Sequence, residues 1–242
     1  EQLGIICTPP IDGHNIPAIK AAIKNAFAAN APVLVHVITK KGKGYAPAEQ
    51  NPSKFHGVGP YDLESGEIKK KVGGNLTYTQ AFSQSLKAEA AKDDSIVVVT
   101  AAMIDGTGLA DFAREYPKRF FDVGIAEEHA VAMAAGLSIG GKKPVVALYS
   151  TFMQRAIDQL IIDVALPREN VVIAIDRAGL VGDDGPTHHG VFDLVYARMV
   201  PNMRVLAPSN EAELVHALHT ALAMGGPFAI RYPRGEGEGV PL

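Results

Sequence analysis

Apolar and polar positions follow two alternating periods along the second two-thirds of the chain. Short, nearly continuous apolar runs are separated by segments in which apolar residues recur every three to four positions, which is the period of a helix. The pattern predicts strands at 96–99, 120–123, 144–148, 171–175, 204–206 and 228–230, and helices at 127–139, 151–166, 190–199 and 211–224. This alternation predicts an α/β fold with a doubly wound, mostly parallel sheet.

A shorter pattern of the same kind comes first. Pro17 opens a segment of helical period, and residues 32–38 form an apolar run that suits a parallel strand covered on both faces. One helix and one strand cannot close a core, so we expect residues 1–45 to be the C-terminal part of a preceding domain of a longer polypeptide. Residues 46–75 lack periodicity and carry prolines, which predicts an interdomain linker. We expect residues 76–242 to form a complete domain.

Two adjacent carboxylates, Glu127 and Glu128, stand where a predicted strand passes through a small-residue turn into a helix. A carboxylate in the first turn of a helix ordinarily complements the helix dipole. Here a loop rich in Gly, Asp and His follows downstream, and two segments that carry arginine flank that loop. These neighbours favour the interpretation of Glu127 as a buried working acid.

The loop is formed by residues 176–190. Its glycines allow the backbone to approach a ligand, and its Asp, His and Arg side chains suit proton transfer and anion binding. A metal site made of Asp183, Asp184, His188 and His189 is one alternative, although their spacing matches no common zinc pattern. A merely solvated polar loop is another.

Arginines follow several of the predicted strands. Arg177 comes directly after one apolar run, and Arg231 and Arg234 follow the last one. The carboxyl ends of parallel strands share one edge, so these guanidinium groups predict a site for a phosphate or a carboxylate. Arg155, one turn into a predicted helix, is either an exposed helical arginine or a further member of this site.

Two aromatic residues mark the turn after the apolar run at 144–148. Phe152 belongs either to the core or, beside Tyr149, to a surface that stacks on a flat heterocycle. Lys41 and its neighbouring lysines offer a second anion contact, with a solvated linker as the alternative. His56 is unremarkable by spacing.

The composition narrows the class of partner. The net charge of −3 gives no basic footprint for nucleic acid, and no apolar run approaches the length that crosses a membrane. A single cysteine excludes an internal disulfide and suits a reducing cytoplasm. We therefore expect a cytoplasmic protein without a nucleic-acid or membrane partner.

Several short motifs resemble those of the thiamine-diphosphate-dependent 1-deoxy-D-xylulose-5-phosphate synthases, a family within the transketolase superfamily. The motifs occur in family order over nearly the whole chain, and their combination is more specific than the general superfamily pattern. The matching sequences are IDGH (11–14), TKKGKGY (39–45), FH (55–56), DVGIAE (122–127), YSTFMQR (149–155), DRAG (176–179), DGPTH (184–188) and RYPRG (231–235).

The resemblance implies roles for individual residues. Glu127 matches the carboxylate that shares a proton with a ring nitrogen of the cofactor's aminopyrimidine, and Phe152 matches the ring that stacks on it. Lys41 resembles a lysine near the cofactor, while His188 and His56 match histidines placed around pyruvate for proton transfer. The residues that match the lining of the acceptor site are Tyr149, Arg155, Arg177, Asp184 and Arg234. Tyr149 is also expected beside the cofactor, His188 beside the substrate, and Arg177 and Arg234 on the substrate phosphate.

The resemblance also implies an activity. In a homodimer that holds thiamine diphosphate and Mg2+, pyruvate condenses with D-glyceraldehyde 3-phosphate, CO2 leaves, and 1-deoxy-D-xylulose 5-phosphate forms. This product feeds the non-mevalonate isoprenoid route and the synthesis of thiamine and pyridoxal. The Gly-Asp-Gly…Asn motif that holds Mg2+ in the family is absent from the 242 residues, so the metal ligands are expected upstream. The alternatives are a transketolase, a 2-oxo-acid dehydrogenase subunit, or a non-catalytic subunit that completes an interface.

Overall fold

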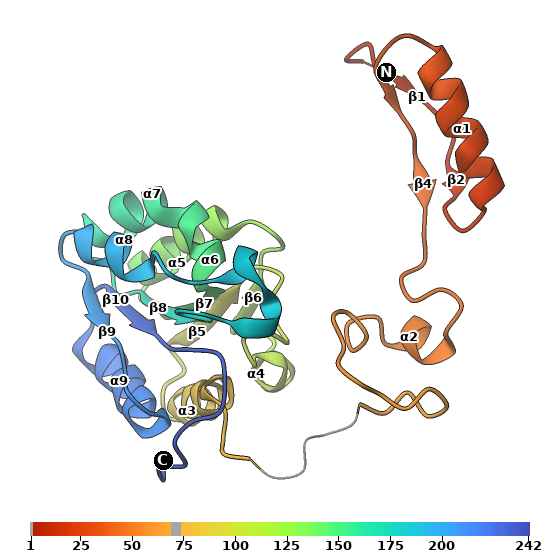
Figure 1. The fold of residues 1–242 in the computed structure, drawn as a ribbon. Helices are drawn as coiled ribbons and strands as arrows, with labels where there is room; N and C mark the ends of the chain where they lie inside the picture. The colour runs from red at the N-terminus through yellow and green to blue at the C-terminus, as the bar shows by residue number, and fades with distance from the viewer. Residues whose placement is uncertain (1, 69–73) are drawn as a thin grey trace. The chain divides into compact units, whose positions relative to one another are not determined.

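The computed structural model describes residues 2–68 and 74–242 (Figure 1). The chain divides into two compact units, residues 1–72 and residues 73–242, and each is treated by itself below. Part of the linker predicted at 46–75 lies outside the described residues.

The second unit is built on a six-stranded sheet, within the described residues 74–242, whose strand pairs are all parallel. The strand order is β6-β5-β7-β8-β10-β9. The strands are β5 (Ile96–Thr100), β6 (Phe120–Asp122), β7 (Lys143–Tyr149), β8 (Val172–Asp176), β9 (Arg204–Leu206) and β10 (Phe228–Arg231). Each strand lies within one residue of its predicted bounds. The four inner strands β5, β7, β8 and β10 are mostly buried apolar runs, which are favoured where both faces of a sheet are covered. The predicted α/β class and the parallel sheet are confirmed.

Helices cover both faces of this sheet (Figure 1). One face is covered by α3 (Tyr78–Lys92), α4 (Ala110–Glu115) and α9 (Glu211–Met224). The other is covered by α5 (Glu127–Ile139), by the segment from α6 (Ser150–Met153) to η2 (Leu160–Ala165), and by α8 (Asp193–Met199). Successive strand residues point to opposite faces, so Val172 and Ala174 of β8 join the first core while Ile173 and Ile175 join the second.

The start of α3 is fixed by a capping box. The backbone N–H of Gln80 donates to Thr77 Oγ1 at 3.2 Å, and the backbone N–H of Thr77 donates to Gln80 Oε1 at 2.9 Å. Both bonds satisfy N–H groups that the first turn of a helix leaves without partners.

The single helix predicted at 151–166 is wrong in detail. The structure has α6, a 3-10 turn η1 (Gln154–Ala156), a short α7 (Ile157–Gln159) and the π-helical η2. The buried positions Met153, Ala156, Leu160 and Val164 keep a spacing of three to four residues. That spacing is the same in a regular helix, so the hydrophobic pattern does not reveal the change of helix type. Such interruptions are frequent at functional sites.

In the first unit, α1 (Ile16–Ala28) begins as predicted, with Pro17 in its first turn and the Asn15 side chain accepting from the Ala18 N–H at 3.1 Å. The run at 32–38 forms two short strands instead of one. β3 (Val33–Leu34) pairs with β1 (Ile6–Cys7), and β4 (Val37–Ile38) pairs with β2 (Ile11–Asp12). Leu34, Val37 and Ile38 are exposed in the unit, and the expectation that the longer polypeptide covers this run on both faces stays a prediction.

The rest of the first unit holds a short helix, α2 (Ala46–Gln50), and an aromatic cluster. The rings of Tyr45, Phe55 and Tyr61 lie 5.3–5.9 Å apart, centroid to centroid. The Tyr45 hydroxyl donates to the Leu63 carbonyl at 3.0 Å. Residues 45–63 therefore have tertiary structure of their own.

The two ends of the second unit are tied together. The Gly237 N–H donates to the Leu76 carbonyl at 2.8 Å, and the Tyr78 N–H donates to the Gly235 carbonyl at 3.1 Å. The buried Glu211 carboxylate at the start of α9 accepts the backbone N–H groups of residues 238–240. The incoming and outgoing segments thus lie side by side.

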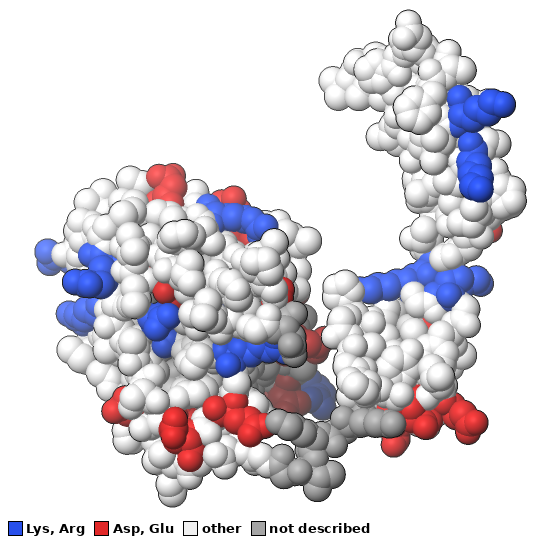
Figure 2. Space-filling view, in the orientation of Figure 1, with Lys and Arg blue, Asp and Glu red and all other residues white. Residues whose placement is uncertain are grey.

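Basic side chains on the visible face of the second unit form small separate groups (Figure 2). Among the helices of residues 2–68 and 74–242, we find none with the length and apolar character that a membrane crossing needs.

Candidate active site

The predicted site residues of the second unit gather at one edge of its sheet. All strands of this sheet run in the same direction, so the segments that follow β5, β6, β7, β8 and β10 leave it at the carboxyl edge. These segments carry every predicted site residue except Lys41 and His56, which belong to the first unit and are exposed there. Contacts between side chains join the gathered residues into one group, here called the site cluster: Glu127, Arg155, Phe152, His188, Tyr149, Arg177, Asp184 and Arg234.

Glu127 is the first residue of α5, and its side chain is only 3% exposed. Arg155 Nη1 donates to Glu127 Oε1 at 2.5 Å. Glu127 Oε2 is buried and has no hydrogen-bond partner among the described residues. A buried polar atom without a partner costs free energy, which makes this oxygen a candidate for ligand contact. Glu128, the next residue, is exposed.

Arg155 lies in the 3-10 turn η1, and its side chain is half exposed. The sequence predicts it in the lining of the acceptor site, whereas its ion pair in the structure is with Glu127. Its guanidinium carbon also lies 5.1 Å from the centroid of the Phe152 ring. Arg155 therefore connects the buried carboxylate to the aromatic part of the site cluster.

The rings of Tyr149 and Phe152 are stacked, with centroids 5.6 Å apart and planes 9° from parallel. His188 meets the Phe152 ring edge-on at 5.5 Å. The Tyr149 side chain is buried, which raises the pKa of its hydroxyl to about 12 despite the opposing effect of the nearby Arg177 cation. The hydroxyl is therefore protonated at neutral pH and able to donate a hydrogen bond. A Cβ at Gly106 would collide with this hydroxyl, so the position requires glycine.

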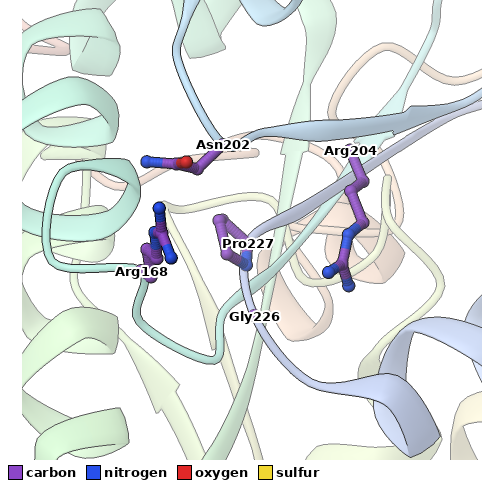
Figure 3. A pocket seen from close by; sticks show the side chains of 5 residues that line it. All are labelled: Arg168, Asn202, Arg204, Gly226 and Pro227. Atoms are coloured by element: carbon purple, nitrogen blue, oxygen red, sulfur yellow. The ribbon is translucent and has the colours of Figure 1, made fainter.

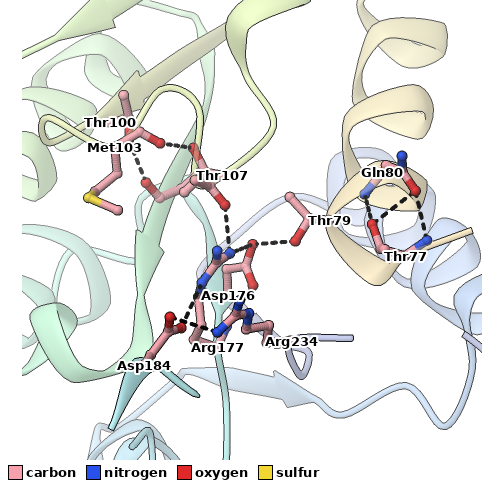
Figure 4. A network of polar contacts seen from close by, with 12 residues as sticks. Thr77, Thr79, Gln80, Thr100, Met103, Thr107, Asp176, Arg177, Asp184 and Arg234 are labelled. Atoms are coloured by element: carbon pink, nitrogen blue, oxygen red, sulfur yellow. Dashed lines mark hydrogen bonds and ion pairs between the residues drawn. The ribbon is translucent and has the colours of Figure 1, made fainter. Parts of the chain in front are cut away.

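A network of ion pairs joins Asp176, Arg177, Asp184 and Arg234 (Figure 4). Arg234 Nη1 lies 2.6 Å from Asp184 Oδ1, and Arg177 Nε lies 3.9 Å from Asp184 Oδ2. Arg177 Nη1 lies 3.1 Å from Asp176 Oδ2, and its guanidinium carbon lies 4.0 Å from the centroid of the Tyr149 ring. Two guanidinium groups therefore share one carboxylate at the edge of the sheet, in an arrangement that suits a phosphate ligand.

Asp176, the last residue of β8, is fully buried. Burial raises the pKa of its carboxyl to about 6, against the opposing effects of the Arg177 cation and of the hydrogen bond from Thr79 Oγ1. Thr79 Oγ1 donates to Asp176 Oδ2 at 2.9 Å. The sequence analysis includes Asp176 in the loop 176–190 and in the DRAG motif without a role of its own, and it does not single out Thr79 or Gly106. Asp176 is adjacent to a predicted residue, but Thr79 and Gly106 reach the site only through the tertiary fold.

The loop that carries Asp184 and His188 is closed at its base. Gly179 and Gly190 exchange two backbone hydrogen bonds of 2.8 Å. Thr151 Oγ1 donates to the Thr187 carbonyl at 2.9 Å, which ties the loop to α6. His188 Nδ1 lies 2.9 Å from Thr187 Oγ1. The loop is therefore anchored at its base and again at Thr187.

Two further residues of the sequence hypotheses have structural partners. His189 Nδ1 accepts the backbone N–H of Val181 at 3.2 Å. Arg231 Nε donates to the buried Asp193 of α8 at 3.0 Å, so this arginine is paired outside the site cluster. The Asp183 side chain lies outside the described part of the structure. Within that part, no group of three or more His, Cys, Asp or Glu side chains is placed to hold a metal ion.

A hollow of about 410 Å³ lies at the other, amino edge of the sheet (Figure 3). Its lining is Arg168, Asn202, Arg204, Gly226 and Pro227. The first of these precedes β8, and the others stand at the starts of β9 and β10. No residue of the site cluster contributes to it.

Comparison with known proteins agrees with this architecture. The model of the family "Transketolase, pyrimidine binding domain" matches residues 74–238, and the chain belongs to this family. Membership implies thiamine diphosphate as the cofactor whose pyrimidine the domain binds.

The chain is also similar over its whole length to 1-deoxy-D-xylulose-5-phosphate synthases. It is 58% identical to the enzyme of Heliobacterium modesticaldum and 58% identical to that of Aquifex aeolicus. The chain spans 37% and 38% of the lengths of these curated relatives. The resemblance found in the sequence motifs is therefore confirmed.

Two solved structures share the fold. One is described as a split gene transketolase, an inactive β4 tetramer; it is 33% identical, covers 70% of this chain and 54% of that chain, and gives a TM-score of 0.60. The other is transketolase from Campylobacter jejuni, which is 16% identical, covers 100% of this chain and 48% of that chain, and gives a TM-score of 0.64. At that lower identity the second likeness concerns the fold alone.

Proposed function

We propose that this chain supplies the pyrimidine-binding and acceptor-binding part of a thiamine-diphosphate-dependent 1-deoxy-D-xylulose-5-phosphate synthase. The complete holoenzyme condenses pyruvate with D-glyceraldehyde 3-phosphate and releases CO2. The observation that carries the proposal is the continuity of the site cluster, from the unpartnered Glu127 oxygen through the Tyr149–Phe152 stack to the arginines around Asp184. The relatives that match the whole chain carry this name.

The residues present fit an aminopyrimidine. A buried carboxylate oxygen without a partner lies in the same cluster as the half-buried ring of Phe152. Glu127 holds the ring nitrogen and shares a proton with it, while Phe152 packs against the flat face of the ring. Thiamine diphosphate, when bound, supplies the electron sink for the loss of CO2. The chain spans less than two-fifths of its relatives, so we assign Mg2+ and the diphosphate to parts of the holoenzyme outside it.

The other residues of the site cluster serve the substrates. Arg177 and Arg234 bind the phosphate of the acceptor, and Asp184 keeps both guanidinium groups in place. The neutral Tyr149 hydroxyl donates a hydrogen bond toward the acceptor. His188, at the edge of the Phe152 ring, transfers a proton at a substrate oxygen. From the first unit we assign His56 to proton transfer and Lys41 to the cofactor, on the motif resemblance.

We further propose that the holoenzyme is a cytoplasmic homodimer. Exposed apolar side chains lie next to the site cluster in the sequence. Ile125, two residues before Glu127, is 82% exposed, and Leu180, in the loop after Arg177, is 76% exposed. A second subunit that covers these side chains would also exclude water from the site.

An assay of the holoenzyme tests the proposed function. With thiamine diphosphate, Mg2+, pyruvate and D-glyceraldehyde 3-phosphate, it should form 1-deoxy-D-xylulose 5-phosphate and CO2 in equal amounts. We expect Glu127→Ala to lower kcat by at least about a hundredfold, since it removes the group that shares the proton. Glu128→Ala is the matched control, because Glu128 is exposed in the same helical turn, and it should change kcat by less than about threefold. An inactive wild type, or an active Glu127→Ala variant, would refute the proposal.

A transketolase is the second candidate, because one similar solved structure at 33% identity carries that name. A transketolase requires a ketose phosphate as the donor and releases no CO2. Supplying the holoenzyme with a ketose phosphate in place of pyruvate separates the two reactions. Product formation with the ketose phosphate as donor and D-glyceraldehyde 3-phosphate as acceptor, but not with pyruvate as donor, would favour the second candidate.

A further inference from the structure

Arg177 is held from one side of its guanidinium group. Nη1 donates to the Gly106 carbonyl at 2.6 Å and lies 3.1 Å from Asp176 Oδ2 (Figure 4). The Nε–H is buried and has no hydrogen-bond partner among the described residues. A guanidinium group binds a phosphate through two N–H groups on one edge. Engagement of Nη1 therefore leaves the edge that contains Nε for a ligand, beside Asp184, whose Oδ2 lies 3.9 Å from Nε, beyond hydrogen-bond distance.

Asp176 uses both of its oxygens within the fold. Oδ1 accepts the backbone N–H of Arg177 at 2.6 Å, and Oδ2 accepts the Thr79 hydroxyl at 2.9 Å and faces Arg177 Nη1. The side chain has no exposed surface. Asp176 therefore has no direct contact with a ligand and acts through its neighbours, among which Arg177 is its ion-pair partner. Burying a carboxylate is costly unless it is paired, and here the partner is a residue of the site cluster.

The other contacts of Arg177 also restrict the conformation of its side chain. Its guanidinium group lies over the Tyr149 ring, with 4.0 Å between the guanidinium carbon and the ring centroid. Its side chain is only 14% exposed. A long side chain that is fixed before binding loses less conformational entropy when the ligand arrives. The network thus fixes the orientation of the Nε edge before a ligand binds.

We propose that Asp176 and Thr79 are positioning residues that fix Arg177 for the phosphate of the acceptor substrate. Thr79 belongs to the first turn of α3 and Asp176 to the end of β8. Their hydrogen bond therefore connects α3 to the carboxylate that pairs with the Arg177 guanidinium group. The identity of the ligand as the acceptor phosphate rests on the proposed function. The competing explanation is a purely structural tie between α3 and β8. That tie would affect all substrates equally.

A comparison of two acceptors separates these explanations. The holoenzyme is assayed with pyruvate and either D-glyceraldehyde 3-phosphate or D-glyceraldehyde, and the ratio of the two kcat/KM values reports the phosphate contacts. We expect Asp176→Asn to lower this ratio about tenfold to a hundredfold, the usual effect of a lost hydrogen bond to a charged group. The KM of pyruvate should change by less than twofold. The matched control is Asp193→Asn, because Asp193 is also buried and paired with an arginine, and there the ratio should not change.

A pair of variants at Thr79 keeps the test valid if Asp176→Asn does not fold. Thr79→Val removes the hydroxyl and should lower the ratio severalfold, whereas Thr79→Ser retains the hydroxyl and should restore it. Binding of glycerol 3-phosphate, measured by calorimetry on the same proteins, gives a readout that needs no catalysis. If the wild type binds glycerol 3-phosphate but makes no product, the proposed function fails and the affinities still decide the positioning role. An unchanged ratio and affinity in folded variants, or equal losses with both acceptors, would overturn the inference.

Discussion

Buried polar atoms without hydrogen-bond partners occur in the site cluster and also outside it. Among the described residues they are Glu127 Oε2, Arg177 Nε and Asp184 Oδ2 of the site cluster, and Ser150 Oγ, Gln159 Oε1 and the Tyr232 hydroxyl outside it. The Asp193–Arg231 pair is as deeply placed, but its carboxylate is paired with its arginine at 3.0 Å. Because unpaired buried groups reduce stability, their concentration at one edge of the sheet indicates a ligand that completes them.

Asp176 makes stability depend on pH. Burial raises its pKa in the folded protein from 3.8 to about 6. The folded state then binds this proton more tightly than the unfolded state does, so the contribution of Asp176 to the free energy of unfolding falls as the pH rises from about 4 to about 6. Arg177, Tyr149 and Tyr232 are the titratable neighbours that share this environment.

Urea unfolding of the wild type and of Asp176→Asn at a series of pH values measures this effect. We expect the free energy of unfolding of the wild type, relative to the variant, to decrease over that interval and to stay constant above pH 7. A relative stability that rises with pH over the interval would contradict the prediction.

At the scale of elements, the sequence predicts the bounds of those strands and helices that depend only on the burial of apolar side chains. The strands of the second unit, and the helices α5 and α9, lie where the apolar pattern places them, because each buries one continuous set of side chains. The 3-10 and π turns around Arg155 leave that set unchanged and are therefore invisible in the pattern. Contacts such as Thr79 with Asp176 join segments 97 residues apart, so they require the tertiary fold. The roles of the predicted site residues stay predictions.

The base of the site loop depends on Gly190. A Cβ at this position would collide with the Arg177 carbonyl and with the Ser150 side chain. We expect Gly190→Ala to lower the free energy of unfolding by about 1–3 kcal/mol, since both neighbours belong to packed elements. In the interior of α5, Gly136 is exposed and an added Cβ would meet nothing within 4 Å. Gly136→Ala is the matched control and should raise stability by up to about 1 kcal/mol.

Thermal and urea unfolding, followed by circular dichroism, measure both glycine variants. The prediction fails if Gly190→Ala is as stable as the wild type. It also fails if both variants change stability in the same direction, because the room available for a Cβ at the two positions would then not decide the effect.

At the scale of the whole molecule, the two units differ in the amount of core that they possess. The second unit buries apolar side chains on both faces of its sheet. In the described part of the first unit, Ala48 is the sole apolar residue that is buried, and Phe27 of α1 is 85% exposed. A unit without a core has little free energy to oppose local opening.

Hydrogen exchange of the isolated chain measures this difference. We expect the amides of β5, β7 and β8 to exchange only through global unfolding, and those of α1 to exchange with protection factors below about ten. Because the first unit buries so few apolar side chains, α1 opens while the six-stranded sheet of the second unit stays intact. Slow exchange in α1, comparable with that in β7, would show that the first unit is stable by itself.

The hydrogen bonds between the two ends of the second unit have a consequence for any polypeptide that is joined to either end. The Gly237–Leu76 and Tyr78–Gly235 hydrogen bonds hold the incoming and outgoing backbone together, and Thr79, one residue beyond Tyr78, reaches the carboxyl edge of the sheet. Polypeptide joined at either end is thus tethered next to the candidate site. Such a tether turns an encounter between separate molecules into an intramolecular one, at an effective concentration in the millimolar range for a short flexible connection. A group on such a polypeptide therefore needs less affinity of its own to bind at the site than the same group on a separate molecule.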